Sequence, residues 1–121
     1  MSVLRYGSTI VVQAGFVKYI LPILFLSSLV DPLAEELGWM SGKKVTVRYW
    51  ITDKQCTRDE AAEAAMLTAM GAADVTLNSR YSDITGYLWT DEDLNIGGHD
   101  LLAELKSNVG KWLILEVQEH A

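Results

Sequence analysis

The sequence has little cysteine and lacks the common cofactor motifs, and each shortage excludes a class of protein. Cys56 is the one cysteine among 121 residues, so no disulfide can form within the chain. A lone thiol is typical of a protein kept in a reducing compartment. The sequence also has no GxGxxG, no phosphate loop and no CxxC pair. Nothing in it therefore indicates dinucleotide, nucleotide or dithiol chemistry.

Basic residues are few as well. The chain has 10 Lys and Arg against 16 Asp and Glu, a formal net charge of -6, and no block of basic residues. Because such a surface repels phosphate backbones, we expect no nucleic-acid partner. A partner bound through charge would be a cation or a basic protein surface.

Half of the residues are hydrophobic and 21% are charged, which is typical of a globular protein rather than a disordered one. A chain of 121 residues is long enough for one core but not for two. We therefore expect one domain over 1–121. A polar junction at 41–44 divides it into an N-terminal arm over 1–42 and a main fold over 43–121.

The longest apolar run extends from Ile10 to Val30 and is long enough to cross a bilayer. Lys18 and Pro22 interrupt it, and a lysine near the centre of a span costs about 2.5–3.5 kcal/mol on insertion scales. No small-x-small cleavage site follows the run. We expect a buried segment of a cytoplasmic protein, with membrane association through this segment as the alternative. Within the arm, we expect an edge strand over 8–12, a hydrophobic helix over 16–30 and a short helix over 32–37.

The main fold alternates strand and helix patterns. Strands are expected over 45–52, 74–81, 84–90 and 112–117. Over 45–52 and 74–81, inward residues alternate with outward ones. A capping box at Thr57 and Glu60 predicts a helix over 57–70, which Gly71 would end. A brief acidic turn over 90–93 and a second helix over 99–108 follow. The order strand, helix, strand, strand, helix, strand predicts an α+β, ferredoxin-like βαββαβ sandwich with both helices on one face of the sheet.

The other face of that sheet would carry most of the large aromatic residues. Its expected members, which are the candidate ligand or interface residues, are Arg48, Trp50, Tyr87, Trp89 and Trp112. That is too much aromatic surface to leave in water on a monomer. The N-terminal arm could cover it, two copies of the chain could pair through it, or it could stack bases as RNA-recognition folds do. The excess of acidic over basic residues argues against stacking of nucleic-acid bases on this face.

A second group of candidates is polar and consists of Asp91, Asp93, His99 and Asp100. Asp91, Asp93 and Asn95 have the spacing of a calcium loop, but Ile96 and Leu102 occupy the places of its essential Gly and Glu. We therefore expect no metal and no cofactor. His99 beside carboxylates could act as a general base, whereas the simpler interpretation is that Asp100 favours the start of a helix and His99 packs locally.

The run GYLWTDEDLNIGGHDLLAEL, followed by VGKWLILEV, is similar to small uncharacterised bacterial proteins, some of them encoded in mobile gene cassettes such as those of integrons. The resemblance covers the chain from Lys43 onward and leaves the arm unmatched. It implies a bacterial, cytoplasmic accessory protein and transfers no site residues.

Taken together, these patterns predict a small non-enzymatic binding or interaction module that acts as a homo-oligomer, such as a homodimer, with a small molecule or a protein as its ligand. The alternative is a small hydrolase or isomerase that uses His99 with Asp91, Asp93 or Asp100. Side chains that converge in a cleft would favour the enzyme, and acidic side chains that point into solvent would favour the module.

Overall fold

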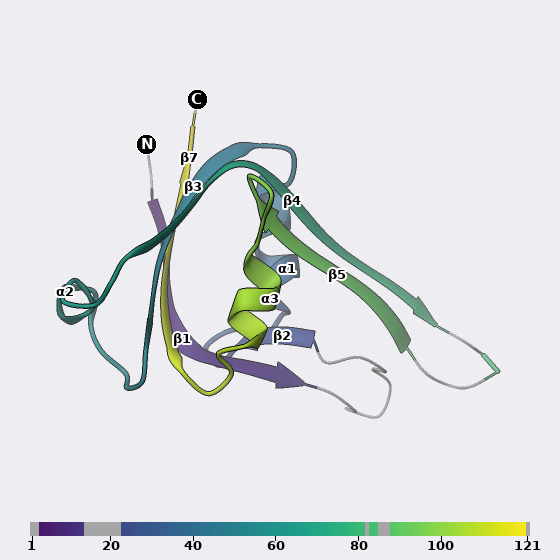
Figure 1. The fold of residues 1–121 in the computed structure, drawn as a ribbon. Coiled ribbons are helices and arrows are strands. Elements are labelled where there is room, and N and C mark those ends of the chain that lie inside the picture. The colour runs from purple at the N-terminus through teal and green to yellow at the C-terminus, as the bar shows by residue number, and fades with distance from the viewer. Residues whose placement is uncertain (1–2, 14–22, 82, 85–87, 121) are drawn as a thin grey trace.

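The computed structural model describes residues 3–13, 23–81, 83–84 and 88–120, with backbone only at 13, 79–81 and 88–90. In this part of the chain seven strands form one curved sheet, in which every neighbouring pair is antiparallel (Figure 1). The order across the sheet is β2-β1-β7-β3-β4-β5-β6. The strands are β1 Val3–Gln13, β2 Ile23–Leu26, β3 Lys44–Thr52, β4 Leu67–Tyr81, β5 Leu88–Ile96, β6 His99–Asp100 and β7 Trp112–Glu119.

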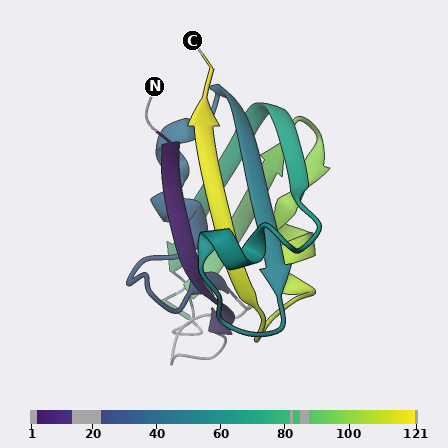
Figure 2. The same cartoon turned by 90° about the vertical axis from the view of Figure 1, so that its left-hand side faces the viewer.

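Four short helical elements accompany the sheet in the described residues: α1 Leu33–Glu36, the 3-10 turn η1 Gly38–Met40, α2 Arg58–Ala61 and α3 Leu101–Lys106. Helices α1 and α3 lie inside the bend of the sheet, between β2 and the β4–β5 hairpin (Figure 1). Helix α2 lies on the opposite, convex side, in front of β7 and β3 (Figure 2). The sheet therefore has a concave face that holds the main core and a convex face with a smaller cover.

The main core forms because alternate residues of the central strands point into the bend. Its fully buried members include Val45 and Val47 of β3, Leu113 and Leu115 of β7, Leu94 of β5, Leu33 and Leu37 at α1, and Leu101 and Leu105 of α3. Each leucine or valine side chain buried in this way contributes about 1.5–3 kcal/mol relative to the exposed state. Packing on both helices thus holds the sheet in its curved form.

Local patterns predicted several elements correctly. Strands β3 and β7 lie where they were expected, α1 falls within 32–37, and α3 buries the three leucines expected of the last helix. The capping box is present at α2: the Glu60 amide donates to Thr57 Oγ1 at 3.2 Å, and the Thr57 amide donates to Glu60 Oε1 at 3.0 Å. Hydrogen bonding to the carboxyl from the Thr57 amide, and then from the Thr57 side chain, holds the pKa of Glu60 below its usual range.

Replacing Thr57 by alanine is expected to lower the free energy of unfolding by about 0.5–2 kcal/mol, because the Glu60 amide loses its cap. Urea denaturation followed by circular dichroism measures the change. Thr57→Ser retains the hydroxyl and is the matched control. An alanine variant with the midpoint of the parent would contradict a role for this cap in stability.

The ferredoxin-like fold is wrong. It requires a helix between the first two strands and four strands with both helices on one face. Instead β3 and β4 are adjacent and antiparallel, and the helices lie on opposite faces of a seven-stranded sheet. The connection between the two strands contains one short helix, α2, which is too short for a crossover.

The predicted helix over 57–70 ends early because β4 begins at Leu67. Residues 67–72 are rich in good helix formers, yet they pair with residues 44–49 of β3. The helix propensities of such residues differ by less than about 1 kcal/mol each. Pairing with β3 contributes more, because it completes the backbone hydrogen bonds of β3 beside Val45 and Val47. Gly71, expected to end a helix, lies within β4 at φ +134, where an added Cβ would be 2.7 Å from Gly97 Cα.

The N-terminal residues do not form a helical arm where the structure describes them. β1 lies between β2 and β7, so the expected edge strand is internal, and residues 23–26 of the expected hydrophobic helix form the edge strand β2. Residues 14–22 lie outside the described residues. Apolar residues in an unbroken run suit a buried strand as well as a helix. Pairing of β1 with β7, and of residues 23–26 with β1, makes these segments strands.

The acidic turn expected over 90–93 is a strand. Hairpin formation by the second and third predicted strands is correct, but β5 starts at Leu88 and continues to Ile96, through all three acidic residues. Asp91 and Asp93 are exposed, and the Glu92 side chain between them is only 4% exposed. Alternation along the strand therefore turns one of the three carboxylates into the bend.

Candidate functional site

The convex face carries three of the five predicted aromatic-face residues. Arg48 and Trp50 alternate along β3, and Trp112 lies on the neighbouring strand β7, opposite Thr52. Tyr87 and the side chain of Trp89 lie outside the described residues. The backbone of Trp89 belongs to β5, which β4 separates from β3. The topology therefore does not place Trp50 and Trp89 on neighbouring strands, as the ferredoxin-like order had required.

Helix α2 covers Trp50. The indole is 2% exposed and packs with Ala61 of α2 and Ile114 of β7. The guanidinium carbon of Arg58 lies 3.8 Å from the centre of the indole ring, so Arg58 stacks on the exposed side of the aromatic group. The cover of Trp50 therefore comes from the chain itself, through residues that follow β3.

Arg58 also belongs to a charged group at the middle of the convex face. Glu116 of β7 accepts from Arg58 Nε at 2.9 Å and from Arg5 Nη2 at 2.6 Å. Burial by itself raises the pKa of the Glu116 carboxyl, but the hydrogen bonds and charges of the two arginines outweigh it and hold the pKa below its usual range. The cluster joins β1, β7 and α2, because Arg5 and Arg58 both pair with the Glu116 carboxylate.

The polar candidates do not converge. Asp91 and Asp93 are exposed on β5, and Asp100 caps α3, where its Oδ1 accepts from the Ala103 amide at 3.0 Å. Among the described residues, no group of three or more His, Cys, Asp or Glu side chains is placed to hold a metal ion.

His99 has two partners that the sequence did not indicate. Its Nε2 lies 2.9 Å from Glu104 Oε1 and 3.2 Å from the Tyr49 hydroxyl, which in turn donates to Glu104. Burial, and then the hydrogen bond and charge of Glu104, raise the pKa of Tyr49. Tyr49 is 2% exposed, whereas the side chains of His99 and Glu104 are 47% and 28% exposed. Their hydrogen bonds join β3 to β6 and α3.

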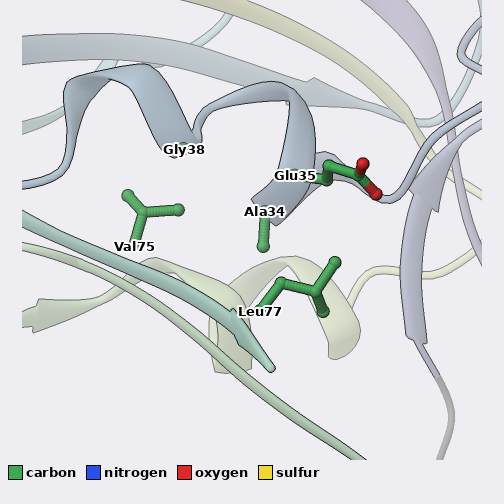
Figure 3. A pocket seen from close by; sticks show the side chains of 5 residues that line it. All are labelled: Ala34, Glu35, Gly38, Val75 and Leu77. Carbon is green, nitrogen blue, oxygen red and sulfur yellow. The ribbon is translucent and has the colours of Figure 1, made fainter. Parts of the chain in front are cut away.

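One hollow formed by the described residues is a groove between α1 and β4. Its volume is about 410 Å³, and its lining residues are Ala34, Glu35, Gly38, Val75 and Leu77 (Figure 3). Ala34 and Val75 are buried and form an apolar floor, whereas Glu35 is exposed at the rim. The size lies within the range of small-molecule sites, and Glu35 is the one charged residue among the described lining residues.

Sequence patterns indicated the orientation of the groove residues but not the groove. Val75 and Leu77 were expected to face inward and Glu35 to face water, and the structure agrees for all three. The hollow depends on how far α1 stands from β4, which is a tertiary distance with no local signal.

Comparison with known proteins gives no match: no family model, curated protein or solved structure corresponds to this chain. The resemblance to cassette-encoded proteins therefore stays a prediction.

None of the helices in the described residues is long and apolar enough to cross a membrane.

Proposed function

We propose that the protein is a small non-enzymatic binding module whose ligand, with an apolar body and a positive charge, occupies the groove between α1 and β4. The groove itself carries this proposal, because it combines an apolar floor with the Glu35 carboxylate at its rim. A ligand pocket needs apolar surface for affinity and a few placed polar groups for orientation. Glu35 is such a group, and the net charge of -6 favours a cation at long range.

The polar candidates support binding rather than catalysis. Two of the three aspartates that would have served His99 are exposed residues of β5, and the third caps α3. His99 instead bonds to Glu104, whose carboxylate also accepts a hydrogen bond from the hydroxyl of the buried Tyr49. A general base needs a reactive proton within reach, whereas His99 and Glu104, whose side chains are 47% and 28% exposed, bond to each other and to Tyr49.

The groove can be blocked by one substitution. Gly38 lines it, has no heavy atom within 4 Å of an added Cβ, and has no positive φ. Gly38→Leu therefore adds an apolar side chain at the wall of the groove without backbone strain. Gly38→Ala adds one methyl group and serves as the matched control.

The probe is the naphthylmethylammonium cation, titrated into the protein while methyl NMR signals of Val75 and Leu77 are followed. We expect saturable shifts of both signals. Gly38→Leu should weaken binding by about tenfold or more, equivalent to roughly 1.4 kcal/mol, and Gly38→Ala by much less. Glu35→Gln should weaken the cation but not neutral naphthalenemethanol. Absence of saturable shifts, or equal affinity in the two Gly38 variants, would refute the groove as the site.

A further inference from the structure

The convex face gathers positive charge in a chain whose net charge is -6. Arg5 of β1, Glu116 of β7 and Arg48 of β3 lie opposite one another in one row across three strands. Neighbouring strands are about 4.8 Å apart, so the two ends of this row are within reach of two long arginine side chains. Arg58 of α2 donates to the same carboxylate from the outer side of the sheet. Three arginines therefore lie around one carboxylate.

One carboxylate leaves two positive charges of this group without a counter-charge. Among the described residues, Glu116 is the only acidic group within ion-pair distance of any of the three arginines. It is also the only acidic residue at the convex-facing positions of β1, β7 and β3, where Lys44 is a further basic one. Asp59 and Glu60 follow in α2, and Glu60 is held in the capping box. Charges on other faces are screened beyond about 8 Å at physiological ionic strength, so they do not cancel the local excess.

The three guanidinium groups keep hydrogen-bond donors for a ligand. Each guanidinium has five N–H donors. Arg5 uses Nε and Nη2 on Glu116, and Arg58 uses Nε on the same carboxylate. Arg48 uses Nη1 in a long hydrogen bond of 3.4 Å to Gln118. Their other nitrogens, including both Nη atoms of Arg58, bond to nothing within the described residues. Because the side chains of Arg5 and Arg58 are 56% and 33% exposed, a ligand can reach these donors.

The surroundings hold Arg58 in place and leave the row beside it uncovered. Its guanidinium carbon lies 3.8 Å from the centre of the Trp50 ring, so the plane of the group is fixed against the indole. Helix α2 lies in front of the lower part of β7 and β3, and no described element lies in front of their upper part (Figure 2). Glu116 and its row come next toward that upper part, because β7 runs from the covered Ile114 to the C-terminus.

We infer that this arginine site, formed by Arg5, Arg48 and Arg58 around Glu116, binds the dianionic phosphoryl group of a phosphate monoester. Such a group carries about -1.5 to -2 charges at neutral pH and three strong acceptor oxygens, which match the two excess positive charges and the free N–H donors. Arginine is the side chain whose planar donors suit phosphate oxygens best. The site lies on the face opposite the groove, so the inference goes beyond the proposed function and does not depend on it.

The test uses the full chain at neutral pH and constant ionic strength, with methyl phosphate as the probe. NMR signals of the arginine guanidinium groups follow the titration. We expect saturable shifts at Arg5, Arg48 and Arg58. Dimethyl phosphate has the same shape around phosphorus but one charge, and it is the matched control. It should bind about tenfold more weakly or worse, since a hydrogen bond between charged groups is worth roughly that factor.

Arg48→Gln is the variant of choice, because Arg48 forms no ion pair with Glu116 and its loss leaves the pairs of that carboxylate intact. It should weaken methyl phosphate by about tenfold. Arg48→Lys keeps the charge and should recover part of the loss. Lys54→Gln removes the same charge from the exposed turn beyond the end of β3 and should change the affinity by less than about twofold.

Equal affinity for methyl and dimethyl phosphate would overturn the dianion as the ligand. Shifts confined to other arginines, or equal losses in Arg48→Gln and Lys54→Gln, would overturn the site. Gly38→Leu, which blocks the groove, should leave methyl phosphate binding unchanged, so the two sites succeed or fail separately. A blocked phosphoserine peptide that binds more tightly than methyl phosphate supports the site with a phosphorylated chain as its ligand, and equal affinities support it with a small phosphate ester.

Discussion

Replacing Trp50 by alanine is expected to lower the free energy of unfolding by about 3–5 kcal/mol, the range for a large aromatic side chain deleted from a packed site. The indole is 2% exposed, packs on Ala61 and Ile114, and has the Arg58 guanidinium stacked on it. Its removal leaves a cavity under α2 and deprives Arg58 of one of its two contacts. Urea denaturation followed by circular dichroism measures the loss.

Trp39→Ala is the matched control, because it deletes the same side chain from a site that is 39% exposed. Its cation contact is weak, with Lys43 Nζ 5.6 Å from the ring centre, so the expected cost is about 1 kcal/mol or less. The difference between the two variants should not depend on protein concentration, because α2 of the same chain covers Trp50. Equal costs would contradict burial under α2, and a concentration-dependent difference would indicate a cover supplied by another copy.

Replacing Lys106 by methionine is expected to lower the free energy of unfolding by about 3 kcal/mol, near the lower end for breaking a buried ion pair. Glu92 is 4% exposed in its side chain, and Lys106 Nζ lies 2.9 Å from its Oε1. The contact between Lys106 Nζ and Glu92 Oε1 is an ion pair without the geometry of a hydrogen bond. The other carboxylate oxygen of Glu92, Oε2, accepts from the Leu24 amide at 3.1 Å. Glu92 thus joins β5 to the open edge of β2 and to α3, and loss of Lys106 leaves its charge buried.

Two companion variants separate charge from packing. Lys111→Met removes a more exposed lysine, 3.9 Å from the 90% exposed Asp53 side chain, and should cost about 1 kcal/mol or less. Glu92→Gln combined with Lys106→Met removes both charges and leaves an amide oxygen for the Leu24 amide, so it should recover much of the lost stability. If the double variant is less stable than Lys106→Met alone, the uncompensated carboxylate is not the cause of the loss.

The sequence by itself determined the elements whose signals are local. Alternation of apolar and polar residues located β3, the capping box located the start of α2, and leucine spacing located α3 and its buried side. These signals depend on neighbours within a few residues, so no knowledge of the fold was needed to interpret them. The inward direction of Val75 and Leu77 follows from the same alternation.

Only the tertiary structure decided the partners of these elements. Residues 67–70 have helical propensity, yet pairing with β3 makes them a strand. The strands β1 and β2 complete the sheet beyond β7, and α2 rather than the N-terminal residues packs on Trp50. His99 meets Glu104 and Tyr49 because the β6–α3 corner folds back onto β3.

The groove belongs to the same category. It exists because the chain leaves β4 at Ser41 while β4 continues along β5, and because α1 stands beside the strand. Per-residue preferences differ by less than about 1 kcal/mol. Hydrogen-bond ladders and buried side chains, summed over many residues, therefore outweigh them and decide which segments become neighbours.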